Sequence, residues 1–268
     1  MRIVSPHRGP YGECGTHVPP LPHCRVDHVV RPMELTWVNR SCLPRDGRLI
    51  PASGHHAGSE ARYRHDEATN DVEGCPMMHS MDGNDVEQAV AEMVRVLTPY
   101  ESADWGRRAG TLDWSCWTTA AHVAHDLLAY AGQLAARPDD AYLPFDLVIR
   151  NDASPRDVLR TVVASGRLLS SVLAASTPEV RAWHWGPTDP SGFAALGVTE
   201  TLMHTYDITQ GLGIDWSPSD SLCRAVLARL FPDAPAGDPV QVLLWSTGRV
   251  DLPGHPRVTS WVMKAAIG

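Results

Sequence analysis

The 268-residue chain has one lysine against 22 arginines, and it lacks the features that mark several common classes of protein. Its 31 acidic side chains outnumber the 23 basic ones, and the formal net charge of −8 argues against a nucleic-acid-binding surface. No apolar run reaches the roughly 18–20 residues that a membrane-spanning helix needs. The first residues contain no apolar core of a secretory signal, so we expect a cytoplasmic protein that binds neither nucleic acid nor membrane.

Paired cysteines are also missing. The six cysteines are scattered, and no two have the C-x-x-C spacing of redox and zinc modules. In a cytoplasmic chain, isolated cysteines are ordinarily reduced thiols, so we expect no disulfide framework.

Residues 1–80 differ in composition from the rest of the chain. They hold nine of the 22 prolines, eight of the 13 histidines and four of the six cysteines, and no window keeps a helical or strand period. We interpret them as a disordered extension. Alternatively, because the arginine-rich composition is typical of a GC-rich gene, they precede a true start at Met77, Met78 or Met81.

From residue 81 onward, apolar residues recur at helical spacing and predict five helices. Asn84, Ser154 and Ser217 are the expected N-caps of three of them, and Pro138, Gly211 and Gly213 are expected stops. With so little strand signal, the pattern predicts an all-α helix bundle. A short apolar run followed by turn residues over 239–261 predicts one or two strands, or an ordered tail. The helices are expected over residues 84–100, 117–138, 154–177, 192–213 and 217–232.

Glu200, His204 and Asp207 lie on the predicted helix 192–213. Residues four apart on a helix share a face, so Glu200 and His204 project side by side, with Asp207 one turn beyond. A carboxylate and an imidazole at this spacing can bind one metal ion. On a solvated face the same pair would be a weak contact of about 0.3 kcal/mol. Here the flanking residues are apolar, and a buried acid needs a partner or a metal, so half of a metal site is favoured.

The other half is expected on the helix 117–138, which carries His122 and His125. Bundles build metal sites from inward side chains on facing helices. Two histidines and a glutamate suit zinc, and three protein ligands leave a fourth position open for water or substrate. Asp207 is then expected to accept a hydrogen bond from the non-coordinating nitrogen of a ligand histidine. Spacing alone does not choose between His122 and His125.

Residues 81–232 resemble the metal-binding N-terminal domain of mycothiol-dependent maleylpyruvate isomerases, part of the DinB-like superfamily. One motif of that family is Glu, three residues, His, two residues, Asp, and Glu200, His204 and Asp207 match it in full. The other motif lies on an earlier helix. It is a tryptophan, seven residues, and a histidine followed by an aliphatic residue and alanine.

The tryptophan motif fits this chain twice, at Trp114 with His122 and at Trp117 with His125. Only His122 is followed by an aliphatic residue and alanine, so the resemblance favours His122 and leaves His125 as the alternative. We interpret both tryptophans as core residues. The metal ligands that the resemblance implies are His122, Glu200 and His204.

The resemblance implies an all-α, DinB-like four-helix bundle over residues 81–232, followed by a short C-terminal extension over residues 233–268. It also implies a divalent metal such as Zn²⁺, with mycothiol or a similar thiol such as bacillithiol at the open position. A zinc-bound thiol is deprotonated near neutral pH, so the protein need not supply a cysteine. The implied activity is a thiol-dependent transferase or isomerase acting on a small-molecule electrophile. Related bundles often form homodimers.

Two alternatives stay open: a non-catalytic, structural or regulatory metal-binding bundle, and a bundle that binds an organic ligand without metal. Family members that isomerise maleylpyruvate carry a further C-terminal domain. The residues after Pro232 are too few to form one, so we expect a related reaction rather than that isomerisation itself.

Other residues near these motifs allow two interpretations each. A loop before helix 192–213 is expected to contain Trp183, His184 and Trp185. One interpretation is a lid on a substrate pocket. We favour the other, in which the tryptophans cover the end of the bundle and His184 lies in solvent. For Arg249 we favour a surface residue over a bidentate partner of a substrate carboxylate. Cys116 lies near a helix start that can lower a thiol pKa, but we interpret it as a packing residue.

Overall fold

The computed structural model describes residues 80–267, so the interpretation of the segment before residue 80 lies outside the described residues. No helix among residues 80–267 is long and apolar enough to cross a membrane. The described residues form the helices α1 (Gly83–Leu97), α2 (Cys116–Ala136), α3 (Pro155–Ala174), α4 (Pro190–Leu212), α5 (Asp220–Leu230) and α6 (Pro239–Ser246), the 3₁₀ turn η1 (Thr98–Tyr100), and a hairpin of β1 (Ala182–Trp183) and β2 (Pro187–Thr188).

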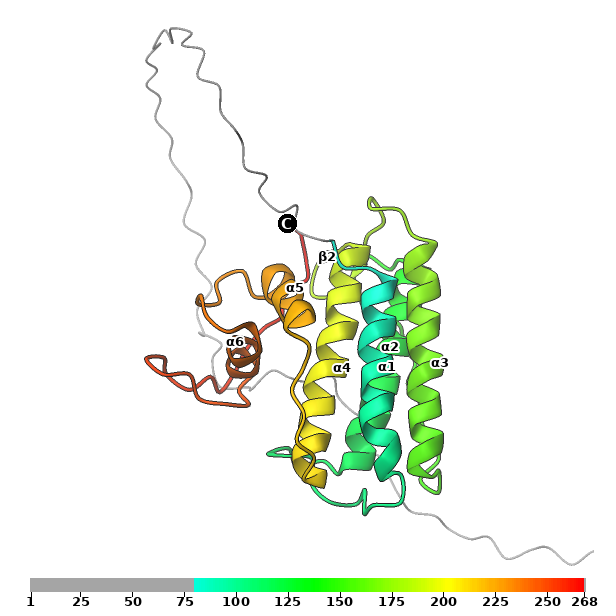
Figure 1. The fold of residues 1–268 in the computed structure, drawn as a ribbon. Coiled ribbons are helices and arrows are strands. Elements are labelled where there is room, and N and C mark those ends of the chain that lie inside the picture. The colour runs from blue at the N-terminus through cyan, green and yellow to red at the C-terminus, as the bar shows by residue number, and fades with distance from the viewer. Residues whose placement is uncertain (1–79, 268) are drawn as a thin grey trace, which may run out of the picture. The chain divides into compact units, whose positions relative to one another are not determined.

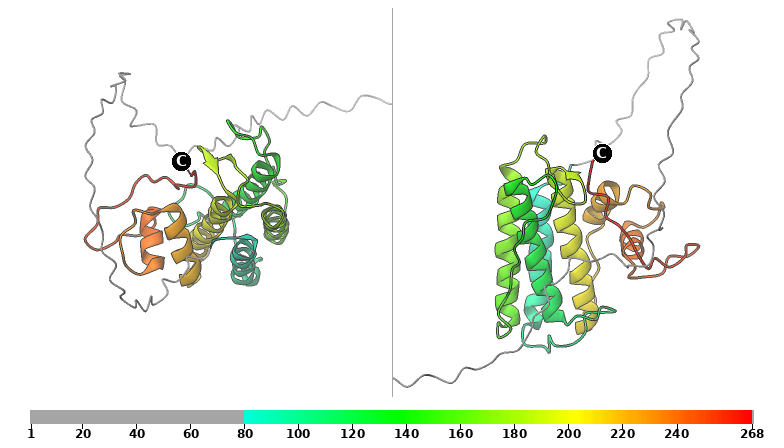
Figure 2. Two further views of the ribbon diagram at one scale, coloured as in Figure 1. Left: turned by 90° about the horizontal axis from the view of Figure 1, so that it is seen from above. Right: turned by 180° about the vertical axis from the view of Figure 1, so that it is seen from behind.

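Helices α1 to α4 form a four-helix bundle, as Figure 1 shows. Helix α2 packs against α3 and α4, and α1 packs against the same two helices, so α1 and α2 lie at opposite corners. Figure 2 shows this arrangement nearly end-on. The all-α fold predicted from the periodicity is confirmed, because one apolar face of each helix lies in a shared core.

The connection between α2 and α3 runs back along the length of α2. Its first residues lie beside the end of α2, where the N–H of Leu143 donates to Oε1 of Gln133 at 2.8 Å. Its last residues lie beside the start of α2, where Nε1 of Trp117 donates to the carbonyl of Ala153 at 2.9 Å. Helices α2 and α3 therefore start at the same end and run parallel, so the bundle contains a long crossover.

Capping residues fix where the helices start, and one of the three predicted N-caps is correct. Ser154 caps α3 as predicted. Helix α1 is capped by Asp82, whose side chain accepts the N–H of Asn84, so the predicted cap lies inside the helix. The N-cap position of α5 is Ser219, two residues after Ser217. Both errors arise because several polar residues near a helix start are competent caps.

Helix α4 contacts α1, α2 and α5 and is buried on nearly every side. Of the two predicted stops, Gly211 lies in the last turn of the helix, where an added Cβ would collide with the carbonyl oxygen of Arg108. The helix ends at the other, Gly213, whose left-handed φ of 72° suits a glycine C-cap. Because α4 is central, polar side chains that it carries are removed from water.

The C-terminal part of the described chain packs beside α4. Helix α5 packs against α4, and α6 packs against α5 (Figure 1). The prediction of strands over 239–261 is wrong, because Pro239–Ser246 form α6. Asp238 caps this helix by accepting the N–H of Gln241, and proline suits the first helical position. Beyond α6 the chain is irregular except for one isolated bridge, so the ordered-tail alternative holds for residues 247–261.

Candidate metal centre

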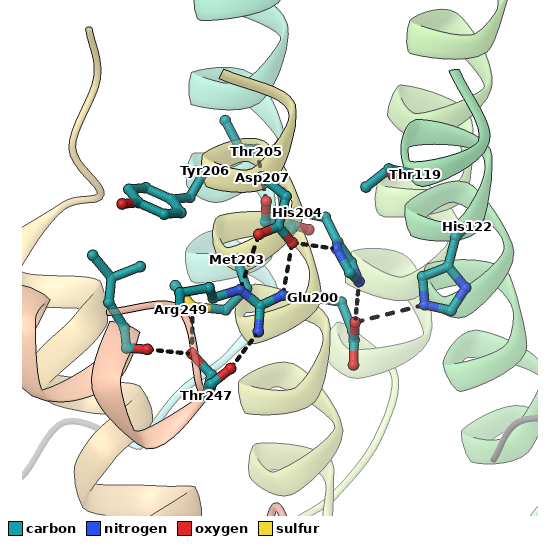
Figure 3. Close-up of polar contacts among 12 residues, drawn as sticks. Thr119, His122, Glu200, Met203, His204, Thr205, Tyr206, Asp207, Thr247 and Arg249 are labelled. Atoms are coloured by element: carbon teal, nitrogen blue, oxygen red, sulfur yellow. Dashed lines mark hydrogen bonds and ion pairs between the residues drawn. The ribbon is translucent and has the colours of Figure 1, made fainter. Parts of the chain in front are cut away.

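Three side chains from α2 and α4 converge inside the bundle, as Figure 3 shows. His122 lies in the second turn of α2, and Glu200 and His204 lie one turn apart on α4. One ligand atom of each lies within 4.8 Å of those of the other two. The residues are 4%, 8% and 1% exposed, so the cluster is shielded from bulk water.

Glu200 lies between the two histidines. Its Oε2 is 3.3 Å from Nε2 of His204 and 3.9 Å from Nε2 of His122. Burial favours a raised pKa for Glu200, but the hydrogen bond and charge of His204 outweigh burial and lower that pKa. Burial favours a lowered pKa for His204, but the hydrogen bonds to Asp207 and Glu200 raise that pKa to about 9. Without a metal, a proton on His204 therefore supplies the positive charge that a cation would bring.

Asp207 joins His204 to the C-terminal segment (Figure 3). Its Oδ2 accepts a hydrogen bond from Nδ1 of His204 at 3.0 Å, the contact that the sequence predicts for this carboxylate. Its two oxygens also accept bonds of 3.2 and 2.7 Å from Nε and Nη2 of Arg249. Burial favours a raised pKa for Asp207, but His204 and Arg249 lower that pKa. Asp207 is therefore a carboxylate that keeps a proton on Nδ1 and turns Nε2 of His204 toward the cluster.

Arg249 does not lie at the surface, so the favoured interpretation of that residue is wrong. Its side chain is 7% exposed, and its carboxylate partner is Asp207 of the protein itself. Nη1 of Arg249 also donates to the carbonyl of Thr247 at 2.9 Å. The guanidinium is therefore held by three bonds within the chain.

His125 faces the crossover connection rather than the cluster. Its Nδ1 accepts a hydrogen bond from the N–H of Leu147 at 3.1 Å, so the ring proton lies on Nε2. That nitrogen is 4.0 Å from Oδ1 of Asp126 and 4.0 Å from Oδ1 of Asp146. Of the two candidate histidines, the structure brings His122 to Glu200 and His204.

Asp126 lies beside the cluster and was missed by the sequence analysis. Its Oδ2 is 3.0 Å from Nε2 of His122, but the two atoms are not aligned for a hydrogen bond. Its Oδ1 is buried and has no hydrogen-bond partner among the described residues. The signal was present in "HVAHD", where His122 and Asp126 have the same four-residue spacing as Glu200 and His204.

Aromatic rings lie close to the cluster. The ring of Trp114 is 4.8 Å from that of His122 and 6.2 Å from that of His204, measured between centroids. Trp114 is only partly buried, so it lines the candidate site rather than filling the core. Trp117 is also partly buried and packs against the core.

His184 is buried, so its predicted place in solvent is wrong. It is 8% exposed, and its Nδ1 forms a hydrogen bond of 3.0 Å with the hydroxyl of Tyr142. Its ring also packs edge-on against Tyr130, with centroids 5.7 Å apart. Burial lowers the pKa of His184 to about 4, so the ring is neutral at physiological pH. Of the two neighbouring tryptophans, Trp183 is partly buried and Trp185 is 62% exposed.

Cys116 and Cys223 are buried free cysteines. Burial raises the pKa of Cys116 to about 11 and that of Cys223 to about 12. Both are therefore protonated thiols at neutral pH, and the interpretation of Cys116 as a packing residue is confirmed.

The donor set fits a divalent metal ion. Two imidazoles and a carboxylate are ligands that zinc accepts, and three protein ligands leave a position open. Both ring nitrogens of His122 are buried without a hydrogen-bond partner among the described residues. Leaving a buried polar group unpaired costs about 1–3 kcal/mol, and a metal bond would remove that cost at Nε2.

Comparison with known proteins gives one family. Residues 86–209 match the family model described as the mycothiol maleylpyruvate isomerase N-terminal domain. The matched range contains His122, Asp126, Glu200, His204 and Asp207, and it ends before Arg249. No curated protein and no solved structure matches the chain. The resemblance seen in the two sequence motifs is thereby confirmed: residues 86–209 match the mycothiol maleylpyruvate isomerase N-terminal domain family.

Proposed function

We propose that the protein binds a divalent metal ion, Zn²⁺, through His122, Glu200 and His204, and that a low-molecular-weight thiol such as mycothiol occupies the open position. The observation that carries the proposal is the buried convergence of these side chains, with no hydrogen-bond partner for the ring of His122 among the described residues. The family match supports the thiol.

The reaction we propose is transfer of the thiol to a small electrophile, or isomerisation of that electrophile through a thiol adduct. A bound Zn²⁺ would favour the thiolate, which is the nucleophile, at neutral pH. The chain itself presents Glu200 and His204 on one face of α4, while Asp207 holds His204 in the tautomer that leaves Nε2 available. The burial of the cluster excludes bulk water, which protects a reactive adduct from hydrolysis.

Metal content tests the binding part of the proposal. The full chain is purified, incubated with zinc, desalted and analysed by elemental mass spectrometry beside the variants His122→Ala, Glu200→Ala and His125→Ala. We expect about one zinc per chain in the wild type, because three ligands form one mononuclear site. The first two variants should lose it. His125→Ala is the matched control, since it removes a buried histidine of the same helix turn and should keep the metal. A wild type without metal would overturn the proposal.

Thiol consumption tests the catalytic part. The metal-loaded protein is incubated with mycothiol and a panel of small electrophiles, and the free thiol and the products are followed by mass spectrometry. Turnover that depends on both thiol and metal is expected, and Glu200→Ala should abolish it. Bound metal without turnover on any electrophile would instead support a non-catalytic metal-binding bundle.

A further inference from the structure

Helix α1 has an outward face that the described part of the chain leaves uncovered. Its inner side contacts α3 and α4, and Figure 1 shows its outer side at the front of the bundle. Two grooves lie along this face. One, of about 620 Å³, lies between α1 and α3, and the other, of about 360 Å³, lies between α1, α4 and the start of α5. Gln88, Ala91 and Arg95 line both grooves, so they form the ridge that separates them.

Small side chains shape the groove between α1 and α3. Gly166 of α3 lies against Val90 of α1, where an added Cβ would come within 2.9 Å of Cγ2 of the valine. The floor of the groove is therefore a close contact of the two helices. Ala91 ends at Cβ and keeps the ridge low, and Val94 and Val163 line the groove while only partly buried. A partly apolar groove beside a low ridge suits another helix, because helices pack with the ridges of one in the grooves of the other.

Opposite charges lie on the two sides of Ala91 along α1. Glu87 lies four residues before Ala91 and Arg95 four residues after it, so all three share one face of the helix. When a helix packs antiparallel against an identical helix about a two-fold axis at one residue, positions equally far before and after that residue face each other. With the axis at Ala91, Glu87 of each copy meets Arg95 of the other. Gln88 meets Val94, so this register brings no like charges together.

The contacts that Glu87 and Arg95 make within the chain leave both charges available. Glu87 accepts a hydrogen bond of 2.9 Å from Oγ of Ser170 and forms no ion pair among the described residues. Arg95 donates to both oxygens of Glu92 at 2.7 Å, but its side chain is 68% exposed, and exposed pairs of this kind contribute little. Glu92 also accepts from Nε1 of Trp216 at 2.9 Å, so it keeps a partner when Arg95 turns outward.

We propose that this face of α1 binds a second copy of the chain, and that the two α1 helices pack antiparallel about a two-fold axis at Ala91. Reciprocal pairs of Glu87 and Arg95 flank the axis, and the ridge of each copy occupies the groove between α1 and α3 of the other. Such a contact uses the same surface on both copies, so it closes at two and forms a dimer rather than a filament. The proposed metal ligands take no part in it, so the dimer forms with or without an ion.

Charge reversal tests the register. Sedimentation equilibrium of the full, metal-free chain is measured at micromolar concentrations for the wild type, Glu87→Arg, Arg95→Glu and the double variant. We expect a wild-type dimer. Each single reversal should raise its dissociation constant at least about tenfold, because the two-fold axis makes every lost attraction and every new repulsion occur twice. The double variant should dimerise like the wild type, since its pairs re-form with the signs exchanged. The two single variants should also dimerise when they are mixed in equal amounts.

Two further variants complete the test. Arg224→Glu is the matched control, because Arg224 is also an exposed helical arginine that pairs with a carboxylate one turn earlier, that of Asp220. It should leave the dissociation constant unchanged. Ala91→Glu places two like charges at the axis and should abolish the dimer, while circular dichroism should show an intact fold, because Ala91 is exposed.

The outcomes that contradict the proposal are distinct. A wild type that stays monomeric overturns it and leaves residues 1–79 or another protein as the occupant of the groove. A dimer that is insensitive to Ala91→Glu uses a different face, which also overturns it. If the two single variants remain monomeric when mixed, Glu87 and Arg95 do not meet across the axis, and the proposed register is wrong.

Discussion

Replacing Arg249 with methionine removes the cation that holds Asp207 and keeps most of the volume of the side chain. In the wild type the two side chains are 7% and 3% exposed and share two hydrogen bonds. Removing one partner of a buried ion pair costs about 3–5 kcal/mol, because the other charge stays buried without compensation. His204 still donates to Asp207 in the variant, so we expect the free energy of unfolding to fall by about 3 kcal/mol, near the lower end of that range.

The same variant should weaken metal binding. Asp207 orients His204 through Nδ1, and without Arg249 one side of that carboxylate is released. Loss of a group that supports a ligand histidine typically lowers metal affinity about 10–100-fold. Stability is measured by urea unfolding of the metal-free protein, and zinc affinity by competition with a chromophoric chelator.

Arg257→Met is the matched control, because Arg257 pairs with Asp251 in the same segment while both side chains are well exposed. Exposed pairs contribute little, so its unfolding free energy should change by less than about 0.5 kcal/mol and its zinc affinity should not change. Arg249→Lys should fall between the two, since it keeps the charge and loses the two-bond geometry. If Arg249→Met matches Arg257→Met in both measurements, the link from Arg249 through Asp207 to His204 does not support the site.

Titration and labelling test other parts of the molecule. At pH 7 zinc binding should release about one proton, because His204 must be deprotonated at Nε2 to bind a metal. Calorimetry in buffers of different ionisation enthalpy measures the number of protons released, and a value of zero would contradict the prediction. The metal-free protein should lose stability as the pH rises from about 6.5 to about 9. The pKa of His204 is raised in the folded state, so its proton stabilises the fold fully only below the pKa of the unfolded chain. Urea midpoints should therefore fall across this range, and His204→Gln should flatten the trend. His184 should change stability in the opposite direction with pH. Its pKa is lowered to about 4 in the folded state, so the unfolded chain binds the proton first and stability falls as the pH drops from about 6.5 to 4. This decrease should be smaller in His184→Gln. Cys116 and Cys223 should resist iodoacetamide in the native protein and react after unfolding, as peptide mass spectrometry would show.

The sequence was sufficient wherever a local pattern decides the outcome. The helical periods predicted the four bundle helices, because an amphipathic helix records its buried face in its own sequence. The spacing of Glu200 and His204 placed them on one face of α4 for the same reason. Helix α6 was missed because eight residues are too short to show a helical period, and an apolar run of that length fits a strand equally well.

Contacts between distant segments were not visible in the sequence. Asp126 follows His122 by one turn, but that pair is common on solvated helix faces, and only the packing of α2 against α4 reveals its buried oxygen. Arg249 lies 42 residues after Asp207, and no spacing rule links an arginine in an irregular segment to a helical carboxylate. His184 was placed in solvent because a loop sequence does not show that the hairpin folds it against Tyr142.

The contact of Arg249 makes the segment after α4 part of the candidate site, although the family match ends at residue 209. The matched range supplies His122, Glu200, His204 and Asp207, and by itself it would leave the buried Asp207 with His204 but without the two hydrogen bonds from Arg249. Helices α5 and α6 bring the chain back so that Arg249 meets this carboxylate from the far side of α4. Asp207 then stays ionised, His204 keeps its proton on Nδ1, and Nε2 remains directed at the cluster. The geometry of the candidate metal ligands thus depends on Arg249, which lies 42 residues beyond Asp207, so the bundle and its C-terminal segment act as one structural unit at this site.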